Sequence, residues 1–229
     1  MSVCLLIFTL NEIDGMKKVV PQINPDWVDE ILIMDGGSTD GTIEEAKKMG
    51  LRIIVQKNKG HGSALIEGVE AIKSDNFILF GPDGNHDVSE IPLLVSKIKE
   101  GYDQVLISRF GKGSINLDAV GIKGKLIDQF GNKLFAFLVN VFFGGHMTDS
   151  LNESRIISKK AFYELKFDAL KMDSTQQMSI RSLKKNQKIY EIVGNEGERI
   201  GGQRKMRPLQ VGTDLSLQIL KEFFYWQSN

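Results

Sequence analysis

The chain has 229 residues, of which 41% are hydrophobic and 25% charged, and its 29 basic residues balance its 29 acidic ones. These values are ordinary for one large globular domain, and a net charge of zero argues against nucleic acid as a partner. The one cysteine, Cys4, has no intrachain partner, so we expect a core residue and a reducing, cytoplasmic compartment.

The first ten residues are apolar but have neither a basic flank nor a small-residue cleavage site. They therefore predict a first core strand rather than a signal peptide. No stretch of the sequence reaches the roughly 18 apolar residues that a bilayer span requires. We expect a chain that is not itself an integral membrane protein.

Apolar runs of strand length alternate with helical patterns through the first half of the chain. The predicted strands are Val3–Leu10, Ile31–Asp35, Arg52–Gln56, Phe77–Gly81 and Gln104–Arg109. The predicted helices between them are Glu12–Val20, Thr42–Met49, His61–Lys73 and Ser89–Glu100. This alternation predicts an α/β fold with a mostly parallel, Rossmann-like sheet flanked by helices. Right-handed crossovers then bring the loops after the strands to one edge of the sheet.

The second half of the chain has a different rhythm. Gly111–Gly124 is rich in glycine and predicts a mobile loop. The helix predicted next, Lys125–Phe143, is apolar on nearly every side in its second half. It is either a core helix or a helix that contacts a membrane interface or a partner, including a second copy of the chain. The remaining predicted elements are a strand at Glu153–Ser158, a helix at Ser174–Lys185, a strand at Lys188–Val193 and a helix at Leu215–Tyr225.

The segment Ile31–Thr42 contains the most informative pattern, an apolar strand that ends in Asp35 and a turn of glycines and small polar residues. Ligands in open α/β sheets bind beyond the carboxyl ends of the strands, where glycines let the backbone approach them closely. The alternative is a tight strand-to-helix turn that Ser38 or Asp40 caps.

A second strand ends in a polar turn at Phe77–Asp87. Hard divalent cations, Mg²⁺ or Mn²⁺, take oxygen ligands from one or two carboxylates and from substrate phosphates, and Asp83 with Asn85 or Asp87 provides such oxygens. The alternative is an N-cap turn for the next helix. The three histidines have no ligand spacing, which argues against a zinc site.

Two further segments suit anions. Asn58–Ala64 opens a helix with glycines and a lysine, and free N–H groups at a helix N-terminus attract phosphate. Glu198–Arg207 holds four cations among glycines, which suits a phosphate clamp as well as a solvated loop.

The order of these motifs resembles that of family 2 glycosyltransferases with the A-type nucleotide-sugar fold. The matching segments are Thr9–Glu12, Asp35–Thr42, Asn58–Gly62, Pro82–Asp83 and Ile107–Arg109. In the second half, Thr148–Arg155, Glu191 and Glu198–Lys205 are similar to motifs of the dolichyl-phosphate (polyprenyl-phosphate) mannose and glucose synthases.

The resemblance implies a single glycosyltransferase domain over residues 1–229, with a nucleotide-sugar-binding half (1–110) and an acceptor-binding half (111–229). The donor-binding residues that it implies are Thr9, Asn11, Glu12, Asp35, Gly36, Lys59, Gly60, Pro82 and Asp83. The residues implied for phosphates of donor or acceptor are Arg109, Arg155, Arg199, Arg204 and Lys205. Asp83 and Asn85 are implied as metal ligands, and Asp83, Asp149 and Arg109 as catalytic residues.

The sequence departs from the family pattern at five places. Gly36 stands where the family commonly has an acid. Gly81 stands where the family has the first acid of its metal motif, and Asn85 replaces a glutamine. Glu153 and Ser154 replace a Gly-Phe pair, and Arg204 replaces a serine. These departures leave the identity of donor and acceptor open.

Three functions are compatible with these residues. The first is an inverting transfer of a sugar from a nucleotide sugar to a polyprenyl phosphate, by an enzyme peripheral on the cytoplasmic face of a membrane. Its acceptor is already an anion, so it needs positioning more than a general base. The second is transfer to a glycan hydroxyl, which requires a base, for which Asp149 is the candidate. The third is a non-catalytic nucleotide-sugar-binding protein, suggested by the missing acid at Gly81.

Overall fold

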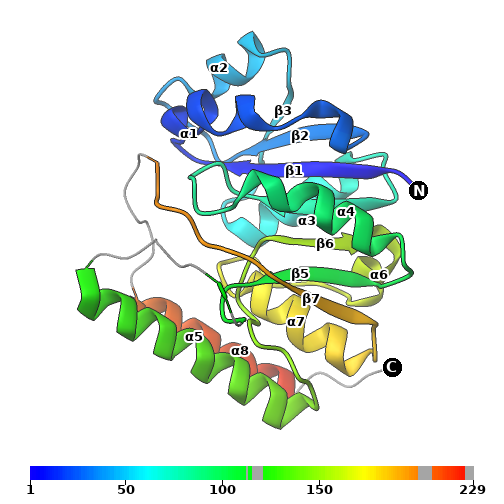
Figure 1. The fold of residues 1–229 in the computed structure, drawn as a ribbon, viewed down its shortest axis with the longest axis vertical. Helices are drawn as coiled ribbons and strands as arrows, with labels where there is room; N and C mark the ends of the chain where they lie inside the picture. The colour runs from blue at the N-terminus through cyan, green and yellow to red at the C-terminus, as the bar shows by residue number, and fades with distance from the viewer. Residues whose placement is uncertain (112, 115–120, 201–207, 225–229) are drawn as a thin grey trace.

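A seven-stranded sheet with the strand order β3-β2-β1-β4-β6-β5-β7 forms the centre of the computed structural model, which describes residues 1–111, 113–114, 121–200 and 208–224 (Figure 1). The strands are β1 Val3–Thr9, β2 Glu30–Asp35, β3 Arg52–Val55, β4 Asn76–Phe80, β5 Gln104–Ser108, β6 Arg155–Ser158 and β7 Ile189–Val193. β6 runs antiparallel to both of its neighbours, β4 and β5, while the other pairings are parallel. The predicted mostly parallel α/β fold is therefore confirmed.

Helices cover both faces of this sheet. They are α1 Ile13–Lys18, α2 Thr42–Lys48, α3 His61–Ala71, α4 Ile91–Ile98, α5 Gly121–Phe143, α6 Lys159–Glu164, α7 Ser174–Lys184 and α8 Pro208–Phe224, with 3₁₀ turns at Val20–Gln22, Pro25–Trp27 and Val88–Glu90. Alternate residues of β1 point to opposite faces, so Leu5 and Ile7 join the core beneath α1 and α4, and Cys4 and Leu6 join the core beneath α3. Burial on both faces explains why β1 and β4 are continuous apolar runs.

Most elements begin or end within a residue or two of the predicted bounds, and the larger differences are in α5, α8 and α6. α5 begins at Gly121, so the prediction of a mobile loop is wrong for residues 121–124, while 112 and 115–120 lie outside the described residues. An existing helix extends readily because each added residue gains one hydrogen bond. α8 begins at Pro208, where the fixed φ and missing N–H of proline suit the first helical turn. α6 is new, and it is too short for a periodic signal.

The last helices form a layer of their own beside the sheet. α5 and α8 lie side by side (Figure 1) and pack on α7 through Val139, Ile180 and Ile219. A buried ion pair between Arg181 and Glu222, with Nε and Oε1 at 2.8 Å, ties α7 to α8. Among the described residues, no helix has both the length and the hydrophobicity that a membrane span requires.

Candidate functional site

The loops after β1 and β2 are held together by the carboxylate of Asp35, which is fully buried at the end of β2. Its Oδ2 accepts hydrogen bonds from Thr9 Oγ1 at 2.7 Å and Ser38 Oγ at 2.6 Å. Its Oδ1 accepts from the backbone N–H groups of Gly37 at 2.8 Å and Ser38 at 2.7 Å. Both oxygens are thus engaged in shaping the turn, and the surface of this loop is formed by the residues around Asp35.

Asn11 joins the first loop to the second. It has a positive φ of 53°, which asparagine tolerates better than most residues. Its Oδ1 accepts from Thr39 N at 2.9 Å, and its own N–H donates to Ser38 Oγ at 2.8 Å. The N–H of Glu12 donates to Thr42 Oγ1 at 2.9 Å. The expected donor-binding residues of β1 and β2, Thr9, Asn11, Glu12, Asp35 and Gly36, therefore lie together at one edge of the sheet.

The turn after β4 is covered by the segment that follows β7. Asp83 Oδ2 forms an ion pair with Arg199 Nη2 at 2.7 Å. The backbone of the covering segment also bonds to the turn, from Ile200 N to Asp83 O at 2.6 Å and from Gly197 N to Asn85 O at 3.0 Å. The structure therefore brings Asp83, Asn85 and Arg199 together, whereas Arg204 and Lys205 lie outside the described residues.

A divalent cation at this turn would need oxygen ligands from a bound substrate in addition to those of the protein. In the described part of the chain, no three His, Cys, Asp or Glu side chains converge as a metal site. Asp83 offers one carboxylate, whose Oδ1 accepts from Asn85 N at 3.1 Å. Mg²⁺ is commonly bound by one or two carboxylates and completed by substrate phosphates. Asp83 therefore fits a cation that is shared with a bound diphosphate.

The N-terminus of α3 packs closely against a distant segment of backbone. A Cβ at Gly60, which has φ 116°, would lie 2.2 Å from Leu170 O, and one at Gly62 would lie 1.9 Å from Ala169 O. This packing alone requires glycine at both positions, independently of any ligand. Lys59 is exposed at the start of the helix, and Pro82 is buried at the end of β4.

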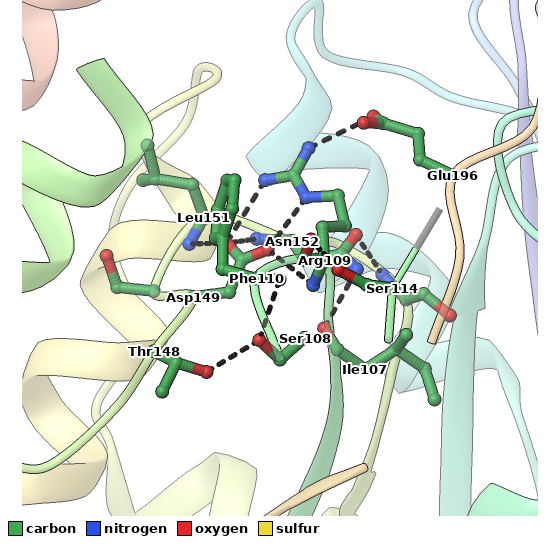
Figure 2. Close-up of polar contacts among 12 residues, drawn as sticks. Ile107, Ser108, Arg109, Phe110, Ser114, Thr148, Asp149, Leu151, Asn152 and Glu196 are labelled. Carbon is green, nitrogen blue, oxygen red and sulfur yellow. Dashed lines mark hydrogen bonds and ion pairs between the residues drawn. The ribbon is translucent and has the colours of Figure 1, made fainter. Parts of the chain in front are cut away.

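Arg109 and Asp149 form a buried, two-point ion pair at the end of β5 (Figure 2). Arg109 Nε donates to Asp149 Oδ2 at 2.7 Å and Nη2 donates to Oδ1 at 3.1 Å, while Nη1 donates to Glu196 Oε1 at 3.1 Å. Burial opposes ionisation of Asp149, but the guanidinium outweighs burial and lowers the pKa of this carboxyl. An acid with a lowered pKa is a weak base, so this geometry suits Asp149 for orienting Arg109 more than for accepting a proton.

Glu191 on β7 holds the turn that presents Asp149. Its Oε1 accepts from Thr148 N at 2.9 Å and from Asp149 N at 3.1 Å, and its Oε2 accepts from Thr148 Oγ1 at 2.9 Å. The sequence places Glu191 in a motif by family resemblance alone, and the structure shows that its carboxylate contacts the turn of Thr148 and Asp149.

Arg155 lies away from the place that the sequence predicts for it. It is fully buried in β6, and its guanidinium donates to Asn152 O at 3.0 Å, Gln104 Oε1 at 3.1 Å and Ser179 Oγ at 3.1 Å. Burial lowers the pKa of Arg155 to about 10, although nearby carboxylates oppose the change. The expectation that Arg155 holds a phosphate disagrees with this location, because every nitrogen of the group bonds to the protein core.

One charged pair at the same edge was missed by the sequence. His61 Nε2 lies 2.5 Å from Glu153 Oε1, and His61 Nδ1 lies 2.9 Å from Ser174 Oγ. Burial opposes both charges, yet each partner favours the other: the pKa of Glu153 falls to about 2 and the pKa of His61 rises. No spacing could reveal three residues so far apart in the chain; the one signal is that Glu153 departs from the family pattern.

Comparisons with known proteins agree with the motifs. The model of the family described as Glycosyl transferase family 2 matches residues 4–166. Glycosyltransferase AglJ of Haloferax volcanii is 27% identical over 222 residues, which cover 96% of this chain and 71% of AglJ. A dolichyl-phosphate hexose transferase of the same organism is 25% identical over 96% of this chain and 93% of its own length. A dolichol-phosphate mannosyltransferase of Pyrococcus furiosus is 31% identical over 49% of this chain and 34% of its own.

Solved structures agree in fold. Glucosyl-3-phosphoglycerate synthase from Mycobacterium tuberculosis, in complex with Mn²⁺, UDP and phosphoglyceric acid, superposes with a TM-score of 0.75 at 22% identity, covering 99% of this chain and 80% of that one. The same enzyme with Mg²⁺ and UDP also gives 0.75, at 20% identity, covering 99% and 81%. The predicted A-type fold and the predicted resemblance to polyprenyl-phosphate sugar synthases are confirmed.

Proposed function

The chain belongs to glycosyl transferase family 2, and we propose that it transfers a sugar, with inversion, from a nucleotide-sugar donor to a polyprenyl-phosphate lipid at the membrane surface. The observation that supports this most is that the loops after β1, β2 and β4 and the Arg109–Asp149 pair after β5 all lie at one edge of the sheet. Ligands of open α/β sheets bind at this edge. The two halves, 1–110 and 111–229, then serve donor and acceptor.

On the donor side, we assign the nucleotide to the joined loops of Asn11, Glu12, Asp35 and Gly36. A nucleotide needs a fixed surface, and the hydrogen bonds that join Asn11 to Ser38 and Thr39 provide one. The exposed Lys59 and the N–H groups at the start of α3 suit the negative charge of the diphosphate.

Asp83 and Asn85 are the residues that would hold a divalent cation, Mg²⁺ or Mn²⁺, together with the donor. When bound, such an ion neutralises charge on the leaving diphosphate. Arg199 already contacts Asp83 at 2.7 Å, so the guanidinium must move when the cation binds, and it is then free to contact a phosphate. Arg204 and Lys205, the other expected phosphate ligands, follow it in sequence.

On the acceptor side, the geometry favours a phosphate over a hydroxyl. A phosphate oxygen is already ionised at neutral pH and attacks without a base, so positioning suffices. A hydroxyl needs a base, and the lowered pKa of Asp149 makes it a weak one. In the proposed reaction, the bond from the acceptor oxygen to the sugar C1 forms as the bond from C1 to the diphosphate breaks. Transfer to a glycan hydroxyl is the alternative.

The apolar outer faces of α5 and α8 give a route to a lipid. Phe130, Leu134, Phe137 and Val141 recur at helical spacing on α5, and all are exposed. Leu217, Leu220 and Phe224 do the same on α8. Amphipathic helices of this kind lie in a membrane interface. We propose peripheral binding to the cytoplasmic face by this surface; pairing with a second copy of the chain is the alternative.

The test is a transfer assay with radiolabelled nucleotide sugars, polyprenyl phosphate in detergent or vesicles, and Mg²⁺ or Mn²⁺. Label in the organic-extractable lipid is the expected result, and label in soluble glycans alone would establish the alternative acceptor. Asp83→Asn should lower turnover by a hundredfold or so if it binds the cation, whereas the exposed control Asp26→Asn should not. If Asp149→Asn loses nearly all sugar transfer to a glycan but keeps transfer to a lipid phosphate, Asp149 acts as the base for the glycan acceptor.

A further inference from the structure

The ion pair of His61 and Glu153 lies between the two parts of the chain that we assign to the donor diphosphate. These are the start of α3 and the turn of Asp83. His61 directly follows Gly60 in the first turn of α3. Glu153 precedes β6, whose last registered pair with β4 joins Arg155 to Leu79. Because the two strands are antiparallel, Glu153 lies level with Gly81, where the turn of Asp83 begins. This is the place where the sugar that is attached to a diphosphate would be found.

Glu153 is held rigidly. His61 fixes its Oε1, Ser174 fixes the other nitrogen of His61, and the imidazole ring packs on the ring of Phe8 at 4.9 Å between centroids. A carboxylate in this position stays ionised throughout the physiological range, so it accepts hydrogen bonds rather than protons.

Part of this carboxylate remains reachable. The side chain of Glu153 is 23% exposed, and no hydrogen bond from the described residues reaches its Oε2. Carboxylates are strong acceptors for hydroxyl groups, and a buried polar partner discriminates sharply between sugars that have or lack the hydroxyl.

We propose that Glu153, positioned by His61, binds hydroxyl groups of the transferred sugar and so helps to select it. This inference rests on the proposed function, because it assumes a nucleotide-sugar donor. It assigns the pair a role in sugar recognition and none in proton transfer.

The experiment compares binding of nucleoside diphosphates with binding of nucleotide hexoses whose sugars differ at one hydroxyl, measured by calorimetry with Mg²⁺. Glu153→Gln should weaken the preferred nucleotide hexose at least about tenfold, as expected for a hydrogen bond to a charged group, and should reduce the preference among epimers. The affinity for the nucleoside diphosphate alone should change by less than about twofold. The matched control is Glu44→Gln, which changes an exposed acid on α2. It should alter neither the binding of the nucleotide hexose nor that of the nucleoside diphosphate.

The outcomes separate clearly. An equal loss for diphosphate and nucleotide hexose, or no loss for either, would overturn the inference and leave a structural pair. If Glu153→Gln does not fold by circular dichroism, Glu153→Asp provides the same comparison with the charge retained and its reach shortened, and an unaltered epimer preference there would overturn it. If the wild-type chain binds no nucleotide hexose at all, the proposed function fails and the inference fails with it.

Discussion

At the scale of single residues, Asp83 is a carboxylate with two competing partners. Arg199 forms an ion pair with it, and the proposed cation would have to replace that guanidinium. The pair is partly exposed, and pairs of this kind contribute about 1 kcal/mol or less. The competition is therefore weak enough for a bound diphosphate, which attracts both the cation and Arg199, to reverse it.

We predict that Arg199→Gln binds Mn²⁺ alone up to about fivefold more tightly, since about 1 kcal/mol of competition is removed. The same substitution should weaken binding of the nucleoside diphosphate, because a cation for its phosphates is lost. Paramagnetic resonance of free Mn²⁺ and calorimetry with the diphosphate measure the two effects. The matched control is Arg52→Gln on β3, which removes a surface ion pair with Glu30 on β2. Unchanged Mn²⁺ affinity would contradict the competition.

Glu90 shows the cost of burying an acid without a cation. Its Oε1 accepts from Asn195 N at 2.9 Å, while its buried Oε2 has no hydrogen-bond partner within the described ranges. Burial raises the pKa of Glu90 from 4.5 to about 7, and the charge of Asp87 adds to the shift. The folded chain therefore keeps a proton between pH 4.5 and 7 that the unfolded chain has released.

It follows that this residue's contribution to stability is full below about pH 4.5 and declines as the pH rises to about 7. We predict that Glu90→Gln, which keeps the acceptor for Asn195, removes this decline and stabilises the fold at pH 8 by on the order of 3 kcal/mol. Urea unfolding at several pH values between 4 and 8 tests it. A parallel pH profile in wild type and variant would show that Glu90 does not titrate in this range.

At the scale of elements, α5 and α8 combine a buried face with an exposed apolar one. Val139 and Ile219 are buried against α7, while Phe137 is 61% and Phe224 is 68% exposed. A ring contact between Phe142 and Phe223, with centroids 5.5 Å apart, joins the two helices. Exposed apolar rows on neighbouring helices are typical of surfaces that bind a partner or a membrane.

We predict that Phe137→Asp combined with Leu220→Asp lowers vesicle binding at least tenfold, because two charges then enter the interface. Donor binding should persist, since neither residue belongs to the loops that we assign to the donor. Vesicle flotation and calorimetry measure the two properties. The matched control, Leu93→Asp, changes an exposed apolar residue on α4 instead. If the double variant loses a dimer in analytical ultracentrifugation and keeps vesicle binding, the surface is an interface between copies.

At the scale of the whole molecule, strands from both halves of the chain alternate in one sheet. β6 lies between β4 and β5, and β7 pairs with the other side of β5. Residues 111–229 therefore complete the sheet that residues 1–110 begin, and the residues proposed for donor and acceptor belong to one sheet.

We predict that a fragment of residues 1–110 does not fold cooperatively. It would leave β5 without a partner strand and expose the edge of β4, and unpaired edges favour aggregation. Thermal unfolding followed by circular dichroism, with the full chain beside it, tests this. A sharp transition in a monomeric fragment that binds donor would show that the first half is an independent domain.

The sequence by itself determined the α/β class, the order of the elements and the edge on which ligands would meet, because these follow from local periodicity and from turns that contain glycine and acids. It predicted that Asp35 ends one buried strand and that Asp83 lies in the turn after another, and the structure has Asp35 at the end of β2 and Asp83 three residues beyond β4. It could not give the helical start of α5 within a glycine-rich segment or the short α6, where the local signal is weak or contrary.

Only the tertiary structure decided what the charged side chains contact. Arg155 occupies the core although its motif suggests a phosphate ligand, Asp149 is saturated by Arg109, and Glu153 meets His61 across the sheet edge. The physical reason is that an ion pair needs two groups within a few ångströms, whereas the chain brings them together from positions tens of residues apart. No local pattern encodes that distance; the register of β6 between β4 and β5 sets it.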